Sequence, residues 1–255
     1  MDRYLLIVST LLAAVGAVFG MMSVHHGIRS RWTVLWMLAS FCCQLSFLGL
    51  RGEARGACPL RDLGEILAFL AWSLTMFYFV VGPPYRLSLL GVFTAPVVVV
   101  FQSVALWPGV LTELSAVKRL SGNPWGETHA AMSVLSYGAL ALAGVAGVMF
   151  LVLDRQLKEH HLKSGLFRNL PPVRELLDSM VRLLWLGTVL LTIGIVAGFI
   201  MPHSGGYGHF AAAVVTWIGY CLLLGIKVVR GMTGRRFSLS AVGMFLVSLT
   251  VFAFV

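Results

Sequence analysis

The sequence predicts an all-α integral membrane protein, and two observations support this fold class. The 255 residues are 58% hydrophobic and 11% charged, with a mean hydropathy of +0.89. Apolar runs recur along the whole chain, and about 18–25 apolar residues suffice for a helix to cross a bilayer. We therefore predict a single polytopic membrane domain over residues 1–255, with eight transmembrane helices and no soluble domain.

The eight predicted spans share apolar runs of this length. They are 4–24, 32–50, 63–81, 87–107, 128–153, 181–201, 210–229 and 238–255. The first is assigned as a span and not as a signal peptide, because its apolar core is long and its basic region is only Arg3 beside Asp2. Prolines at 83–84 end the third span, and Pro96 predicts a kink in the fourth.

The basic residues orient these spans. Of the 19 Lys and Arg residues, 13 fall on the side of the loops that follow the odd-numbered spans, and the other six fall on the opposite side. By the positive-inside rule the 13-residue side is cytoplasmic. Both termini then lie on the outer (periplasmic) face of a bacterial inner membrane. The net charge of +9 thus orients the protein in the lipid bilayer, and we predict no nucleic-acid partner.

The four cysteines exclude two kinds of site. Cys42, Cys43 and Cys221 lie within predicted spans, and only Cys58 lies in an outer loop. The chain contains neither a Cys-x-x-Cys nor a Cys-x-x-Cys-His motif. It therefore has no thiol redox pair of this kind, and any haem would be held non-covalently, as haem b.

Two local patterns predict contacts between helices. Arg61, Asp62 and Glu65 predict a small charge cluster at the start of the third span, where acidic groups suit the helix dipole. The fifth span is rich in small residues after position 137. Such residues permit close approach of a neighbouring helix or of a flat ligand, and close helix packing is the favoured interpretation.

The stretch that opens the fifth span carries the candidate site. Trp125 precedes His129 on the first turn, and Ser133 and Tyr137 follow at i+4 and i+8. This spacing predicts one polar stripe that descends from the membrane surface into an apolar helix. An interfacial anchor remains the alternative for Trp125 and His129, and a buried core position for Tyr137.

Three histidines are predicted at the outer ends of the fifth, sixth and seventh spans: His129, His203 and His209. The loop 203–209 reads HSGGYGH, and its glycines would let a macrocycle approach. Two facing imidazoles would suit bis-histidine ligation of haem iron, with His129 opposite His209 or His203. Tyr207, Phe210 and Trp125 would pack against the porphyrin. A tight turn between antiparallel helices explains the glycines equally well.

Four stretches resemble the cytochrome c assembly family, which includes the CcsA, CcmC and HemX-like membrane proteins. They are CPLRDLGE at 58–65 with Trp72, the stretch 125–137, the stretch 177–198 with LTIG at 191–194, and the stretch 216–236. They follow the family's order and cover a family core from about residue 51 to 255. The resemblance implies a haem-handling protein that takes part in cytochrome c biogenesis on the outer face.

The sequence departs from the haem-exporting members of that family. Their Trp-x-Trp-Asp-Pro signature is absent, and GYGH stands at 206–209 in its place. No histidine follows the last span, and Gly225 occupies the position of a membrane histidine in the seventh. Only His129 matches a haem-ligand position of the family. The pattern most resembles the HemX and YpjD-type branch.

Two functions follow as hypotheses. The first is haem delivery or assembly, with partner subunits or apocytochrome c, and without a visible catalytic residue set. The second is a HemX-like membrane regulator or scaffold, in which the basic loop 155–174 docks a cytoplasmic enzyme of haem biosynthesis. Ion-coupled transport is disfavoured, because no acidic residue is predicted at mid-membrane depth.

Overall fold

The computed structural model describes residues 2–26, 31–81, 87–113, 123–158, 173–200 and 207–254. These residues form helices and connecting turns, without a β-strand among them. The helices are α1 (Asp2–His26), α2 (Arg31–Arg55), α3 (Leu63–Val81), α4 (Leu87–Ala105), α5 (Pro124–Lys158), α6 (Val173–Ile200), α7 (Tyr207–Val229) and α8 (Gly234–Ser248), which a 3₁₀ segment, η3 (Leu249–Phe254), extends. The predicted all-α class is confirmed.

Six of these helices are long and apolar enough to cross a membrane: α1, α2, α3, α5, α6 and α7. The apolar part of α4 is shorter, and α8 has 15 residues before η3. The chain is therefore a multi-pass helical membrane protein. The full count of eight spans stays a prediction.

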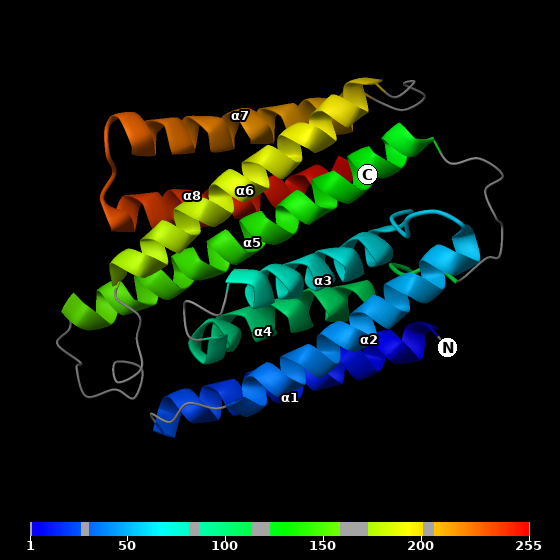
Figure 1. Cartoon of the computed structure of the whole chain (residues 1–255), viewed down its shortest axis with the longest axis horizontal. Coiled ribbons are helices and arrows are strands. Elements are labelled where there is room, and N and C mark those ends of the chain that lie inside the picture. Colours follow the sequence, from blue (N-terminus) through cyan, green and yellow to red (C-terminus); the bar gives the residue numbers. More distant parts are fainter. Residues whose placement is uncertain are drawn as a thin grey trace.

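The helices run side by side along the long axis in two groups (Figure 1). α1 to α4 pack together as one group and α5 to α8 as the other, and α3 joins the two by packing on α5. Both ends of the chain point toward the same end of the bundle, which we call the Asp2 end. Which membrane face this end occupies stays a prediction.

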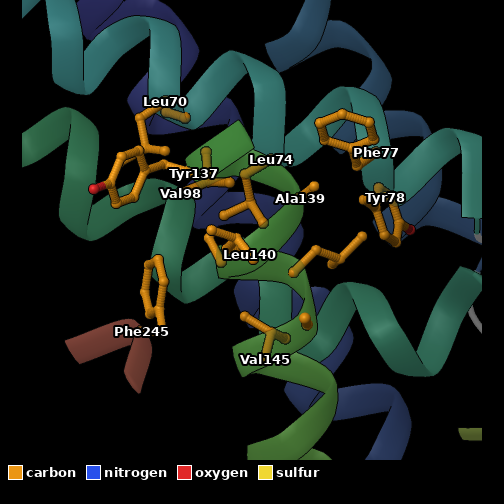
Figure 2. Packing of buried hydrophobic residues seen from close by; sticks show 14 of the residues in the cluster. Leu70, Leu74, Phe77, Tyr78, Val98, Tyr137, Ala139, Leu140, Val145 and Phe245 are labelled. Carbon is orange, nitrogen blue, oxygen red and sulfur yellow. The ribbon is translucent and has the colours of Figure 1, made fainter. Parts of the chain in front are cut away.

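The core lies where the two groups meet. α5 is the most buried of the six apolar helices. Figure 2 shows Leu74 of α3 beside Leu140 of α5 and Leu70 of α3 beside Tyr137, with Phe245 of α8 close by. Buried apolar side chains from both groups thus form one continuous cluster, which favours a single unit around α5.

Small residues let α5 approach its neighbours, as predicted. A Cβ atom at Gly138 would collide with Ser73 of α3, and one at Gly187 of α6 would lie 2.7 Å from Leu140. Gly144 faces Phe245 of α8. The glycines of α5 therefore serve close helix packing and not a flat ligand, because protein atoms occupy the space beside them.

The helices that contain the predicted fifth and sixth spans are longer than those spans. α5 continues to Lys158 and α6 already begins at Val173, whereas the predicted spans end at 153 and begin at 181. Leu176, Met180 and Leu183 are buried at helical spacing. An amphipathic stretch that precedes an apolar run therefore extends the helix, because its apolar face packs against the bundle.

Candidate functional site

The first turn of α5 is fixed by a cap at the Asp2 end. Asn123 precedes the helix, and its side-chain oxygen accepts the backbone N–H of Trp125 at 3.1 Å. Its carbonyl accepts the N–H of Glu127 at 3.1 Å, and Pro124 occupies the first helical position. Asparagine and proline both favour these positions. The cap determines which face of α5 each following residue takes.

His129 lies one turn into α5 and points toward α6. Its side chain is buried, with an exposed fraction of 8%, and its Nδ1 lies 2.7 Å from the carbonyl oxygen of Gly194. A carbonyl can only accept, so this contact places a proton on Nδ1, and in a neutral imidazole the lone pair then lies on Nε2. Metal-binding histidines are typically oriented by such a second hydrogen bond.

Two glycines of α6 form the groove that receives this face of α5. A Cβ atom at Gly198 would lie 2.8 Å from Nδ1 of His129, and one at Gly194 would lie 2.7 Å from the hydroxyl of Ser133. Phe210 of α7 also comes within 3.1 Å of the position that a Cβ at Gly198 would take. α6 and α7 therefore enclose the imidazole, and only a residue without Cβ fits beneath it.

The other residues of the predicted polar stripe lie at different depths in the helix bundle, from the surface to the core. Trp125 is 47% exposed at the surface. Ser133 lies against Gly194, one turn below His129. Tyr137 is buried in the core, where Figure 2 shows it beside Leu70, and its hydroxyl interacts with Thr216 of α7. Tyr137 is thus a core residue below the imidazole.

The predicted second ligands cannot be placed in the same way. His203 lies outside the described residues, and of Tyr207 and His209 only the helical backbone of α7 is described. α7 begins at the Asp2 end, so position 209 shares that end with His129. Among the described residues no group of three or more His, Cys, Asp or Glu could hold a bare metal ion. Haem iron needs at most two axial ligands from the protein.

The predicted charge cluster at the start of α3 is confirmed for Asp62 and Glu65, but its arginines are Arg51 and Arg55, since Arg61 joins only through its backbone N–H. Glu65 is fully buried and accepts Arg51 at 2.8 Å, Arg55 at 2.7 Å and the backbone N–H of Arg61 at 2.9 Å. Arg51 also pairs with Asp2 at 2.8 Å. Asp62 caps α3 by accepting the N–H of Glu65 at 2.7 Å. We call Asp2, Arg51, Arg55, Asp62 and Glu65 the Arg51 network.

Arg51 and Arg55 were not predicted as members of this network, although the sequence carries a signal for them. The two arginines stand four residues apart at the end of the second apolar run, so they lie on one face of α2. Charged side chains are almost never fully buried unless they are paired. This spacing, together with Glu65 in the first turn of α3, was the available evidence for a buried ion network.

A cavity of about 140 Å³ lies between the α2–α3 connection and the first turns of α5. Its lining residues come from both segments: Arg55, Ala57, Cys58, Leu60, Arg61, Asn123, Gly126, Glu127 and Ala130. Burial, together with the carboxylates of Glu127 and Glu65, raises the pKa of the Cys58 thiol. Cys58 is therefore a protonated thiol at neutral pH and not a reactive thiolate. We call this cavity the Arg61 pocket.

Comparison with known proteins identifies the family. Residues 60–255 match the family described as "Cytochrome C assembly protein". The chain belongs to this family. Its relatives include proteins named "Cytochrome c biogenesis protein CcsA" from Crocosphaera subtropica (28% identical, covering 80% of this chain and 78% of the relative), Microcystis aeruginosa (27%, 91% and 85%) and Guillardia theta (30%, 74% and 70%).

Family membership confirms the predicted resemblance. The assignment to the HemX and YpjD-type branch stays a prediction, since the relatives named above are CcsA proteins. In this chain the cap of α5, the imidazole of His129 and the glycines of α6 lie together at the Asp2 end.

Proposed function

We propose that this protein handles haem in cytochrome c biogenesis and that His129 is an axial ligand of the haem iron. The observation that carries the proposal is the contact between Nδ1 of His129 and the Gly194 carbonyl, in a groove that excludes a Cβ atom. A histidine that serves only as an interfacial anchor does not require this fixed tautomer. An iron ligand does, because the metal binds the nitrogen that carries the lone pair.

The residues at this site fit one side of a haem. The imidazole of His129 supplies one nitrogen donor, and Gly194 and Gly198 hold its ring in place. His209 or His203 would supply the opposite ligand, and Trp125, Tyr207 and Phe210 would line the macrocycle. Haem itself would supply an iron centre and a hydrophobic plane. In this chain it would be bound non-covalently as haem b, since no Cys-x-x-Cys-His motif is present.

The partners follow from this role. Thioether attachment of haem would then need a separate partner, and reduced cysteines on the apocytochrome that receives the haem. We place the Asp2 end on the outer face of a bacterial inner membrane, on the basis of the distribution of Lys and Arg. The CcsA names of the relatives support a role in biogenesis.

The regulatory alternative receives no comparable support. It depends on the basic loop 155–174, and most of that loop lies outside the described residues. The relatives are named for cytochrome c biogenesis and not for haem synthesis.

Absorption spectroscopy of the purified protein tests the proposal. We expect the wild type in mild detergent, from haem-replete cells, to show a Soret band and low-spin visible bands on reduction. His129→Ala should lose or shift these bands, whereas His25→Ala, an exposed histidine at the opposite end of α1, should leave them unchanged. A wild type that stays colourless when haem is added contradicts the ligand assignment.

A further inference from the structure

We propose that the Arg61 pocket is a carboxylate-binding subsite that receives a propionate of the haem ligated at His129. This inference rests on the proposed function, because it names the second point at which the same ligand is held. Ala130, the residue that follows His129, lines the pocket. The pocket and the imidazole therefore lie on adjacent faces of the same turn of α5.

Arg55 supplies the buried part of the subsite. Its side chain is only 5% exposed, and it lines the pocket from the end of α2. One terminal nitrogen donates to Glu65 at 2.7 Å, whereas Nε has no hydrogen-bond partner among the described residues. A buried guanidinium with an unmet donor is costly, so a ligand oxygen nearby would stabilise it.

Arg61 supplies an accessible cation on the same pocket. Its guanidinium is exposed and forms no ion pair within the part of the chain that the structure describes. The first turn of α5 adds the positive end of a 35-residue helix through Asn123 and Gly126. Two guanidinium groups and a helix start favour an anion at this place.

Glu127 lines the same pocket and opposes an anion by like charge. Removing a cation from the pocket should therefore lower its affinity for a carboxylate, and removing Glu127 should raise it. These opposite effects provide a test of the proposal. The cavity of about 140 Å³ is far smaller than the roughly 300–1,000 Å³ that buries a whole drug-sized ligand. It suits one short acidic side group and not a porphyrin ring.

The test compares haem with haem dimethyl ester, in which both propionates are neutral methyl esters. Each is titrated into the full-length protein in detergent, and the dissociation constant is measured from the Soret band. We expect the wild type to bind haem more tightly than the ester. Arg61→Gln should weaken haem binding by about three- to tenfold and leave ester binding unchanged. Glu127→Gln should tighten haem binding and not ester binding.

Controls separate this subsite from general effects. Arg61 is exposed and its backbone N–H, not its side chain, contacts Glu65, so Arg61→Gln should fold normally. Arg55→Lys retains the buried charge and should weaken haem binding alone. Arg235→Gln removes an exposed arginine at the opposite end of the bundle and should change neither affinity.

Two outcomes overturn the proposal in different ways. If wild type and Arg61→Gln bind haem and its ester equally, while His129→Ala binds neither, the subsite is wrong and the ligand assignment stands. If the wild type binds neither compound, the proposed function is wrong and the subsite fails with it. An equal loss of both ligands in Arg61→Gln also contradicts a carboxylate contact.

Discussion

Two regions at the Asp2 end hold polar groups out of water by opposite means. The Arg51 network buries full charges and satisfies them with several partners, as Glu65 does with three donors. The α6 groove buries the imidazole of His129 against the Gly194 carbonyl and beside two glycines, which carry no Cβ atom. The stability of the network depends on all of its charged side chains. The packing of the groove depends on the lack of a Cβ atom at Gly194 and Gly198.

The largest expected effect comes from removing the central carboxylate of the network. Glu65→Gln neutralises the acceptor that Arg51 and Arg55 share at 2.8 and 2.7 Å, and leaves two buried guanidinium groups under-compensated. Breaking a buried ion pair in this way costs about 3–5 kcal/mol. We expect that loss in the free energy of unfolding, measured in detergent with increasing SDS.

An exposed ion pair provides the matched control. Lys158 and Asp154 lie 2.7 Å apart, but the Lys158 side chain is 61% exposed. Asp154→Asn should cost less than about 1 kcal/mol, because water already screens the pair. If Glu65→Gln were no more destabilising than Asp154→Asn, the Arg51 network would contribute little to the stability of the group formed by α1 to α4.

Gly198→Ala tests whether the α6 groove has room for a methyl group. The new Cβ would lie 2.8 Å from Nδ1 of His129, so the imidazole or α6 must move. Overpacking costs about 1–3 kcal/mol, and the better helix propensity of Ala offsets about 1 kcal/mol of it. We expect a net loss of up to about 2 kcal/mol and a shift of the ¹⁵N resonance of Nδ1 as its hydrogen bond lengthens.

Gly243→Ala is the control for this substitution. No protein atom lies within 4 Å of the Cβ position there, so only the gain in helix propensity remains. The variant should be as stable as the wild type or more so, with the His129 resonance unchanged. Equal behaviour of the two variants would mean that the groove tolerates a methyl group and does not hold the imidazole.

The difference between these two regions also explains what the sequence could predict. The lengths of the apolar runs predicted the helices, because the thickness of a bilayer fixes how many consecutive apolar residues a spanning helix needs. His129 was predicted as a site residue because ionisable side chains within membrane helices tend to be functional. The partner of its Nδ1 is a backbone carbonyl 65 residues away, which carries no side-chain signal.

The Arg51 network was predicted only in its local part for the same reason. Asp62 and Glu65 are neighbours in the chain, so their part of the cluster could be predicted, whereas Arg61, predicted with them, contributes only its backbone N–H. Asp2 and Arg51 join it from α1 and α2 through contacts that depend on how three helices pack. Helix length follows from composition, whereas pairing between helices follows from tertiary packing.

A smaller effect is expected where α6 and α7 are joined beside the groove. The indole N–H of Trp217 donates to the hydroxyl oxygen of Thr192 at 2.8 Å. Thr192→Val removes one neutral hydrogen bond and should cost about 0.5–1.5 kcal/mol. A double-mutant cycle with Trp217→Phe should recover most of that value as coupling energy. Purely additive losses would show that the bond contributes nothing between these helices.

The smallest expected effect lies at Cys58, between the two regions. Burial and the Glu127 and Glu65 carboxylates raise its pKa, and Arg55 and Arg61 line the same pocket. A raised pKa lowers the thiolate fraction at a given pH, and the thiolate is the species that a maleimide alkylates. Glu127→Gln removes one carboxylate, so the pKa should fall and the rate–pH profile should move to lower pH.

At a fixed neutral pH, Glu127→Gln should therefore increase the rate of Cys58 alkylation by about two- to fivefold. A charged, water-soluble maleimide with peptide mapping assigns the labelled residue, and Cys58→Ser provides the blank. Lys158→Gln, at the other end of α5, should leave the rate unchanged. An unchanged or slower rate in Glu127→Gln would place its carboxylate too far from the thiol to act on it. Glu127 is the charged residue that α5 contributes to the Arg61 pocket. That result would therefore mean that α5 and the Arg51 network are less closely packed at the pocket than the lining residues indicate.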